Sequence, residues 1–208
     1  RYARGIEVSR DAGFGGAGGA IFNSGTLSLS ACTLSANTTG GGGDGLKNGV
    51  GGAGGAGGAI FNSGTLTLIA CTLSANTTGD GGDGDYGDGG DGGDGGAIFN
   101  NGTLTLSACT LSANTTGDGG FGHSGNTGIA DGVDGGDGGD GGDGAGIYNA
   151  ASAFLQNVIC AQNQLGIGGD GDISNLCASG VNGIGADVFG GIESQGHNLI
   201  GDPAHSWG

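Results

Sequence analysis

The chain has 208 residues, of which 59 are glycine, one is proline and none is methionine. Interrupted Gly-Gly-X triplets with almost no proline exclude a collagen-like triple helix, which needs a strict three-residue period and abundant proline. A net charge of −16 argues against nucleic acid as a partner and makes cations the natural counterpart.

One pattern recurs four times along the chain. Its first three copies are nearly identical and the fourth is weaker; they span residues 18–40, 57–79, 95–117 and 144–164. The constant part is about 20 residues long, and the length variation lies in glycine-rich inserts between the copies. Such repeats are typical of solenoids, in which one coil cannot bury its apolar face alone and stacked coils can.

Each copy predicts three short strands. In the first copy these strands centre on Ile21, on the alternating pair Leu27 and Leu29, and on Cys32 and Leu34. Stacked coils would align equivalent residues in inward columns: Leu27, Leu66 and Leu104; Leu29, Leu68 and Leu106; Cys32, Cys71, Cys109 and Val158; and Leu34, Leu73, Leu111 and Cys160. The sequence therefore predicts an all-β solenoid of about four to five coils, as a single domain over residues 1–208.

Glycine-rich inserts occupy residues 41–56, 80–94 and 118–143, and their triplets are in phase. A polyproline-II helix has three residues per turn, so a Gly-Gly-X run would place every X on one edge and leave two bare glycine faces. Bare faces let backbones approach closely and pair. We therefore expect packed polyglycine-type hairpins that form a side layer; flexible linkers are the alternative.

The tetrapeptides "GGAI" and "LSAN" resemble the GGA[IVL] and FxxN motifs of chlamydial polymorphic outer-membrane proteins, although Leu34, Leu73 and Leu111 replace the family's phenylalanine. The stretch 186–202 resembles the closing coil of secreted bacterial β-helix repeat proteins. Together these resemblances cover about half of the chain. They imply a right-handed parallel β-helix at the cell surface, often adhesive, and they do not explain the inserts.

Two polar ladders are candidate sites. The aspartates of the inserts could bind Ca²⁺, which takes several oxygen ligands, or could simply form a solubilising acidic face. The sequons at Asn37, Asn76 and Asn114 predict a stacked, hydrogen-bonded asparagine ladder, which Asn163 continues without a sequon. Asn101, or the neighbouring threonines, are better glycan carriers.

The cysteine column fits small buried side chains with reduced thiols. A Cys71–Cys109 disulfide is also geometrically possible, because stacked strands lie about 4.8 Å apart, and Cys160 could pair with Cys177.

Catalysis is not expected. The histidines His123, His197 and His205 lack metal-binding spacing, Glu7 and Glu193 form no recognisable acid pair, and basic residues are absent after Lys47. We therefore expect no enzyme, and no catalytic, cofactor-binding or metal-binding residue is assigned.

The sequence leaves three functions open. The first is a secreted structural protein that assembles end to end into an extracellular fibre, because solenoid ends offer unpaired strand edges and the basic residues cluster near the start of the chain. The second, which the family resemblance implies, is a surface adhesin or autotransporter passenger fragment, with cell-surface glycans as expected ligands. The third is ice binding through two outward hydroxyl columns, formed by Thr26, Thr65 and Thr103 and by Ser28, Thr67 and Thr105. No signal peptide and no membrane-spanning apolar run is visible, and since Arg1 is not an initiator methionine we expect processing from a precursor.

Overall fold

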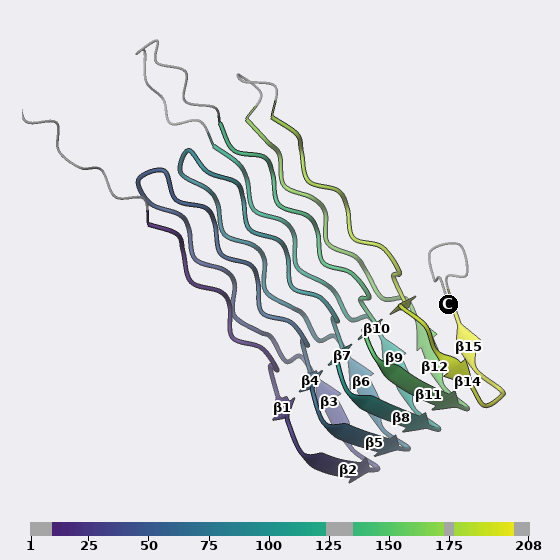
Figure 1. Cartoon of the computed structure of the whole chain (residues 1–208). Coiled ribbons are helices and arrows are strands. Elements are labelled where there is room, and N and C mark those ends of the chain that lie inside the picture. Colours follow the sequence, from purple (N-terminus) through teal and green to yellow (C-terminus); the bar gives the residue numbers. More distant parts are fainter. Residues whose placement is uncertain (1–9, 124–134, 173–176, 202–208) are drawn as a thin grey trace, which may run out of the picture.

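The computed structural model describes residues 10–123, 135–172 and 177–201, and all regular elements in these ranges are β-strands (Figure 1). In this part of the chain there is accordingly no helix long and apolar enough to cross a membrane. Three strands form each coil. The strands are β1 (Ile21–Asn23), β2 (Thr26–Ser30) and β3 (Thr33–Ser35); β4 (Ile60–Asn62), β5 (Thr65–Ile69) and β6 (Thr72–Ser74); β7 (Ile98–Asn100), β8 (Thr103–Ser107) and β9 (Thr110–Ser112); β10 (Ile147–Asn149), β11 (Ser152–Gln156) and β12 (Ile159–Ala161); and β13 (Val188–Phe189), β14 (Glu193–Ser194) and β15 (Leu199–Ile200).

The coils stack into three parallel sheets, β1-β4-β7-β10-β13, β2-β5-β8-β11-β14 and β3-β6-β9-β12-β15. Equivalent residues pair across the coils, so Leu27 lies opposite Leu66, and Leu66 lies opposite Leu104. The structure thus confirms the predicted β-solenoid, with about four full turns and a shorter fifth coil.

The bends between strands explain part of the repeat. Ala31 lies between β2 and β3 with φ 51°, and its counterparts Ala70 and Ala108 have φ 51° and 54°. The glycine three residues before the first strand of each coil, such as Gly57, also has a positive φ (71° at Gly57), a conformation that glycine adopts without a steric penalty. Each coil therefore turns at the same positions, which keeps the strands in register.

The core is the set of predicted inward columns. Leu66, Leu68, Leu104 and Leu106 have no exposed surface. Leu29, expected in the same column, is only partly buried, because it lies in the first coil and no described coil covers its outer side.

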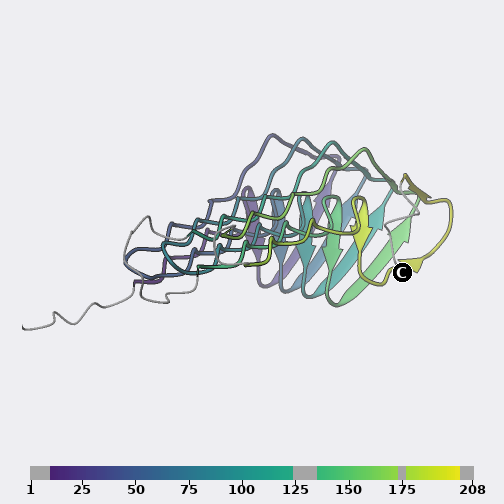
Figure 2. The ribbon, with the colours of Figure 1, turned by 90° about the horizontal axis from the view of Figure 1, so that it is seen from above.

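Beside the solenoid, the glycine-rich segments run as extended legs (Figure 2). We call residues 39–46, 78–85, 117–123 and 164–172 the outgoing legs, and residues 10–18, 49–58, 87–96, 135–146 and 177–185 the return legs.

Like legs, meaning two outgoing or two return legs of successive coils, are joined by backbone hydrogen bonds at three-residue intervals. For example, the N–H groups of Gly51, Gly54 and Gly57 donate to the carbonyls of Asp88, Asp91 and Asp94 at 2.8–2.9 Å. Other bonds join outgoing to return legs, such as Gly90 N–H to Gly82 O at 2.8 Å. The described parts of the inserts are therefore hydrogen-bonded to one another; their polyproline-II type stays a prediction, and the turn of the third insert (residues 124–134) lies outside the described residues.

Candidate functional site

Two asparagine ladders run through the stacked coils. In the predicted ladder, Asn76 Nδ2 donates to Asn114 Oδ1 at 2.8 Å and to Leu34 O at 3.1 Å. Asn114 Nδ2 likewise donates to Asn163 Oδ1 at 2.8 Å and to Leu73 O. Asn76 and Asn114 are fully buried with both amide hydrogens donated, so the fold has no space for a glycan at either sequon. Asn101 is exposed on the turn between β7 and β8.

A second ladder escaped the sequence interpretation. Asn23, Asn62 and Asn100 each donate Nδ2 to the Oδ1 of the asparagine in the next coil, at 2.7, 2.7 and 2.6 Å. The repeated "IFN" was its signal, because it places an asparagine at the end of the first strand of every full coil. The first ladder closes at Asp187, whose Oδ1 accepts from Asn163 Nδ2 at 2.7 Å.

No disulfide joins the cysteines in the structure. Cys71 and Cys109 are buried in one column, and the Cys109 thiol lies 3.4 Å from Leu68 O, as expected for reduced packing residues. Burial raises the pKa of the Cys109 thiol, and it raises that of Cys160 further. Cys160 contacts Asp187 O and Cys177 contacts Gly135 O, so the possible Cys160–Cys177 pair does not form.

Five aromatic rings form an outward ladder along the first sheet. Phe22, Phe61, Phe99, Tyr148 and Phe189 are stacked with ring centroids 4.8–4.9 Å apart. Phe22, the terminal ring in the first coil, is 60% exposed. The sequence interpretation assigned these residues no role, although one ring occurs in every coil immediately after the inward residue of the first strand.

Large exposed apolar side chains concentrate in the first and last coils. Phe14, Phe22 and Leu46 belong to the first coil and its legs, and Val50 lies on the next return leg. Ile159, Ile167, Val181, Ile184 and Leu199 belong to the fourth and fifth coils and their legs. Between these groups, only Ile69 and Phe121 are large, apolar and exposed among the described residues. Exposed large apolar side chains therefore gather toward the two ends of the solenoid.

The third and fourth return legs carry aspartate at every X position: Asp88, Asp91 and Asp94, then Asp137, Asp140 and Asp143. The carboxylates of Asp88, Asp91 and Asp94 each accept the backbone N–H of the equivalent aspartate in the following leg, at 2.8–3.0 Å. Burial raises the pKa of Asp94 from 3.8 to about 6, and the charges of Asp143 and Asp91 add to this effect. Nowhere in the described ranges do three or more His, Cys, Asp or Glu side chains gather closely enough to hold a metal ion, and Ca²⁺ binding stays untested.

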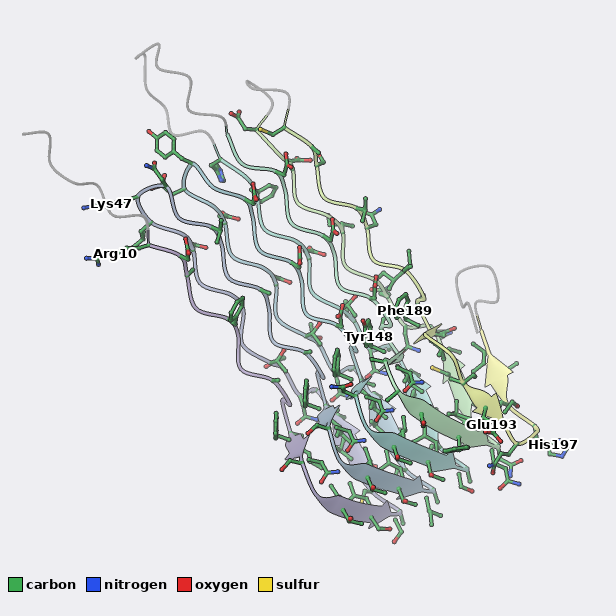
Figure 3. All side chains as sticks on the ribbon, in the orientation of Figure 1. Arg10, Lys47, Tyr148, Phe189, Glu193 and His197 are labelled. Atoms are coloured by element: carbon green, nitrogen blue, oxygen red, sulfur yellow. The ribbon has the colours of Figure 1, made fainter. Side chains whose placement is uncertain are left out.

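The remaining residues named from the sequence do not gather at one place. His123 lies edge-on to Phe121, with ring centroids 6.1 Å apart, in the third outgoing leg. Glu193 and His197 are exposed in the fifth coil, and Arg10 and Lys47 lie at the outer part of the first legs (Figure 3). Glu7 and His205 lie outside the described residues. The hydroxyl columns face outward as expected, with Thr26, Thr65 and Thr103 exposed on β2, β5 and β8.

Comparisons with protein-family models, with curated protein sequences and with solved structures found no match. The resemblance of the GGAI and LSAN tetrapeptides to polymorphic outer-membrane proteins therefore stays a prediction, and any function must be argued from the geometry of the chain itself.

Proposed function

We propose that this chain is an extracellular structural protein whose solenoids stack end to end into a fibre. The observation that carries the proposal is the placement of exposed apolar side chains in the first and last coils, with an acidic and hydroxyl-rich middle between them. Exposed apolar groups of this kind mark interaction surfaces.

The exposure of inward side chains in the first coil supports the same proposal. Ile21, Leu27, Leu29 and Cys32 are only partly buried, whereas Ile60, Leu66, Leu68 and Cys71 in the second coil are at most 1% exposed. The sequences of the two coils are nearly the same, so the difference arises because no described coil covers the outer side of the first coil. A further coil would cover these side chains and stabilise the joint by about 25 cal/mol per Å² of apolar surface.

Electron microscopy and light scattering of the 208-residue chain at micromolar concentration test the proposal. We expect filaments from the unchanged chain and none from Phe22→Asp or Leu199→Asp, which place a charge on an exposed apolar residue at either end. The matched control is Phe121→Asp, because Phe121 is exposed in the middle of the molecule, and filaments should persist. Circular dichroism checks that each variant stays folded. Monomers of the unchanged chain under these conditions would refute the fibre.

Ice binding is a second candidate, favoured by the outward hydroxyl columns. Side chains on neighbouring strands lie about 4.8 Å apart, and threonine has a stiff χ1 angle, so the array is regular and uncharged. Ile69 and Phe154 interrupt it on the same outward face. Thermal hysteresis in dilute solution that is lost in Thr67→Lys would support this function. No described feature favours an adhesin over a fibre subunit, and the same microscopy separates these two.

A further inference from the structure

Backbone-to-backbone hydrogen bonds between equivalent legs of successive coils all run in one direction along the solenoid, from an N–H of the earlier leg to a carbonyl of the later one. In every pair of successive return legs, the residue that follows the X position of a triplet donates its N–H to the carbonyl of the X residue in the next leg. Gly15, which follows Phe14, donates to Ala53 O at 2.8 Å, and Gly92, which follows Asp91, donates to Asp140 O at 2.8 Å. The last pair keeps this direction, since Gly141 donates to Val181 O at 2.8 Å. The layer is therefore polar, with carbonyl groups directed to one end and N–H groups to the other.

The two ends of this layer carry complementary backbone groups. On the first return leg, the X carbonyls of Asp11, Phe14 and Ala17 accept no hydrogen bond from the described residues. On the last return leg, the equivalent donors, the N–H groups of Ser179, Asn182 and Gly185, have no acceptor in the described ranges. Both sets repeat every three residues.

From this complementarity we infer that the partner of the first coil is the last coil of a second copy, and that the fibre is head-to-tail and polar. The inference rests on the proposed fibre. Three free N–H groups then meet three free carbonyls in the register that all internal leg pairs use. A head-to-head joint would instead place carbonyl against carbonyl and leave polar backbone groups unpaired, which costs free energy when they are buried.

Side chains at the two ends fit the same joint. In the register of the internal pairs, Val181 would lie beside Phe14 and Ile184 beside Ala17 of the next copy, which brings exposed apolar groups together. The aromatic ladder also has one terminal ring at each end, Phe22 and Phe189, so a head-to-tail joint would continue it. On the last outgoing leg (residues 164–172), one of the equivalent N–H groups is already bonded, because Asn182 Oδ1 accepts Gly168 N–H at 3.1 Å. The return leg is therefore the main hydrogen-bonding contact of the joint.

Cysteine cross-linking tests the polarity. Phe14→Cys and Val181→Cys are made separately, allowed to assemble alone or in an equimolar mixture, and treated with a short bismaleimide. We expect 14-to-181 links in the mixture only, mapped by mass spectrometry so that native cysteines do not interfere. Phe121→Cys mixed with Val181→Cys is the control and should give no intermolecular link.

The outcomes separate the two proposals. Fibres whose links join residue 14 to residue 14, or residue 181 to residue 181, would overturn the head-to-tail inference and leave the fibre standing. Absence of any assembly would overturn both. A second variant, Ser179→Pro, removes one of these three N–H groups, because proline has no backbone donor. We expect a several-fold higher critical concentration with an unchanged melting temperature of the monomer; no change in critical concentration would contradict the role of that donor.

Discussion

At the scale of single residues, aspartate does more than make the glycine-rich layer soluble. In a Gly-Gly-Asp leg both glycine N–H groups can bond to neighbouring legs, and the aspartate N–H then faces the outer edge. The carboxylate of the preceding leg accepts it, as Asp91 Oδ1 accepts Asp140 N–H at 2.9 Å. The third backbone N–H of each triplet, that of aspartate, is thus bonded to a side chain of the preceding leg. Where the X residue of the preceding leg has no acceptor atom in its side chain, the equivalent N–H in the following leg is left to water.

The asparagine ladder gives the sharpest stability prediction. Asn114→Ala removes the acceptor of Asn76 N–H and Nδ2, at 3.0 and 2.8 Å, inside the core. Because each buried unsatisfied donor costs about 1–3 kcal/mol, we expect a loss of about 2–5 kcal/mol in the free energy of unfolding. Urea unfolding measures it. Asn101→Ala is the exposed control and should stay within about 0.5 kcal/mol. Equal stability of the two variants would contradict the ladder.

The raised pKa of Asp94 predicts a pH dependence. Burial raises the folded-state pKa from 3.8 to about 6, so the folded state binds the proton more tightly than the unfolded chain. The free energy of unfolding should therefore fall as the pH rises from about 4 to about 6. Thermal melting between about pH 4 and about pH 7 checks this. Asp94→Asn should weaken the dependence; the raised pKa of Asp143, again caused by burial, leaves a remainder.

At the scale of elements, the legs pack backbone against backbone, so closely that the contact leaves no room for a side chain. A Cβ built at Gly90 would collide with the carbonyl oxygen of Gly52 in the preceding return leg, whereas one built at Gly16 meets no atom within 4 Å. Glycine in the layer is thus a packing requirement, and the legs differ from linkers of similar composition for this reason.

Gly90→Ala should separate the legs and lower the melting temperature by several degrees, because overpacking costs about 1–3 kcal/mol or more. Gly16→Ala is the matched control and should melt like the unchanged chain. Amide exchange localises the effect: exchange at Gly82 and Gly90 should accelerate in the first variant only. Random-coil exchange at these glycines in the unchanged chain would show that the layer is not formed.

The repeats made the strands, their registers and the inward leucines predictable, since equivalent positions in near-identical coils must pair. The outward ring ladder was not predicted from the sequence, although one ring follows the inward residue of the first strand in every coil. The acceptor role of aspartate was also hidden, since it depends on which legs are neighbours. The apolar ends emerge only when residues as distant as Phe14 and Val181 are placed on the folded chain.

At the scale of the whole molecule, the contrast between apolar ends and an acidic middle would favour association along the solenoid axis, as in the proposed fibre. Lateral contacts would bring together aspartate columns of like charge, which repel at low salt. Axial contacts would bury the partly covered side chains of the first coil. The shape and the charge of the molecule therefore favour the same direction of growth.

Thiol labelling gives a direct readout of this arrangement. Cys32 is half-buried in the first coil, and the three cysteines Cys71, Cys109 and Cys160 are buried. Iodoacetamide should modify Cys32 in monomers and not in fibres, because a stacked coil covers it. The buried Cys71, Cys109 and Cys160 should stay unmodified in both states and serve as internal comparisons, and peptide mapping resolves the sites. Undiminished labelling of Cys32 in fibres would contradict the axial joint.

In-register pairing of near-identical coils also bears on how such a gene changes. Deletion of residues 60–97 would place Ile98 opposite Ile21, with every leucine and asparagine column intact, because both strands pair with β4 in the same register. Unequal recombination between repeats can therefore shorten or lengthen the protein by whole coils, and the remaining strands still pair in register. The length of the molecule is free to evolve in steps of one strand spacing, about 4.8 Å.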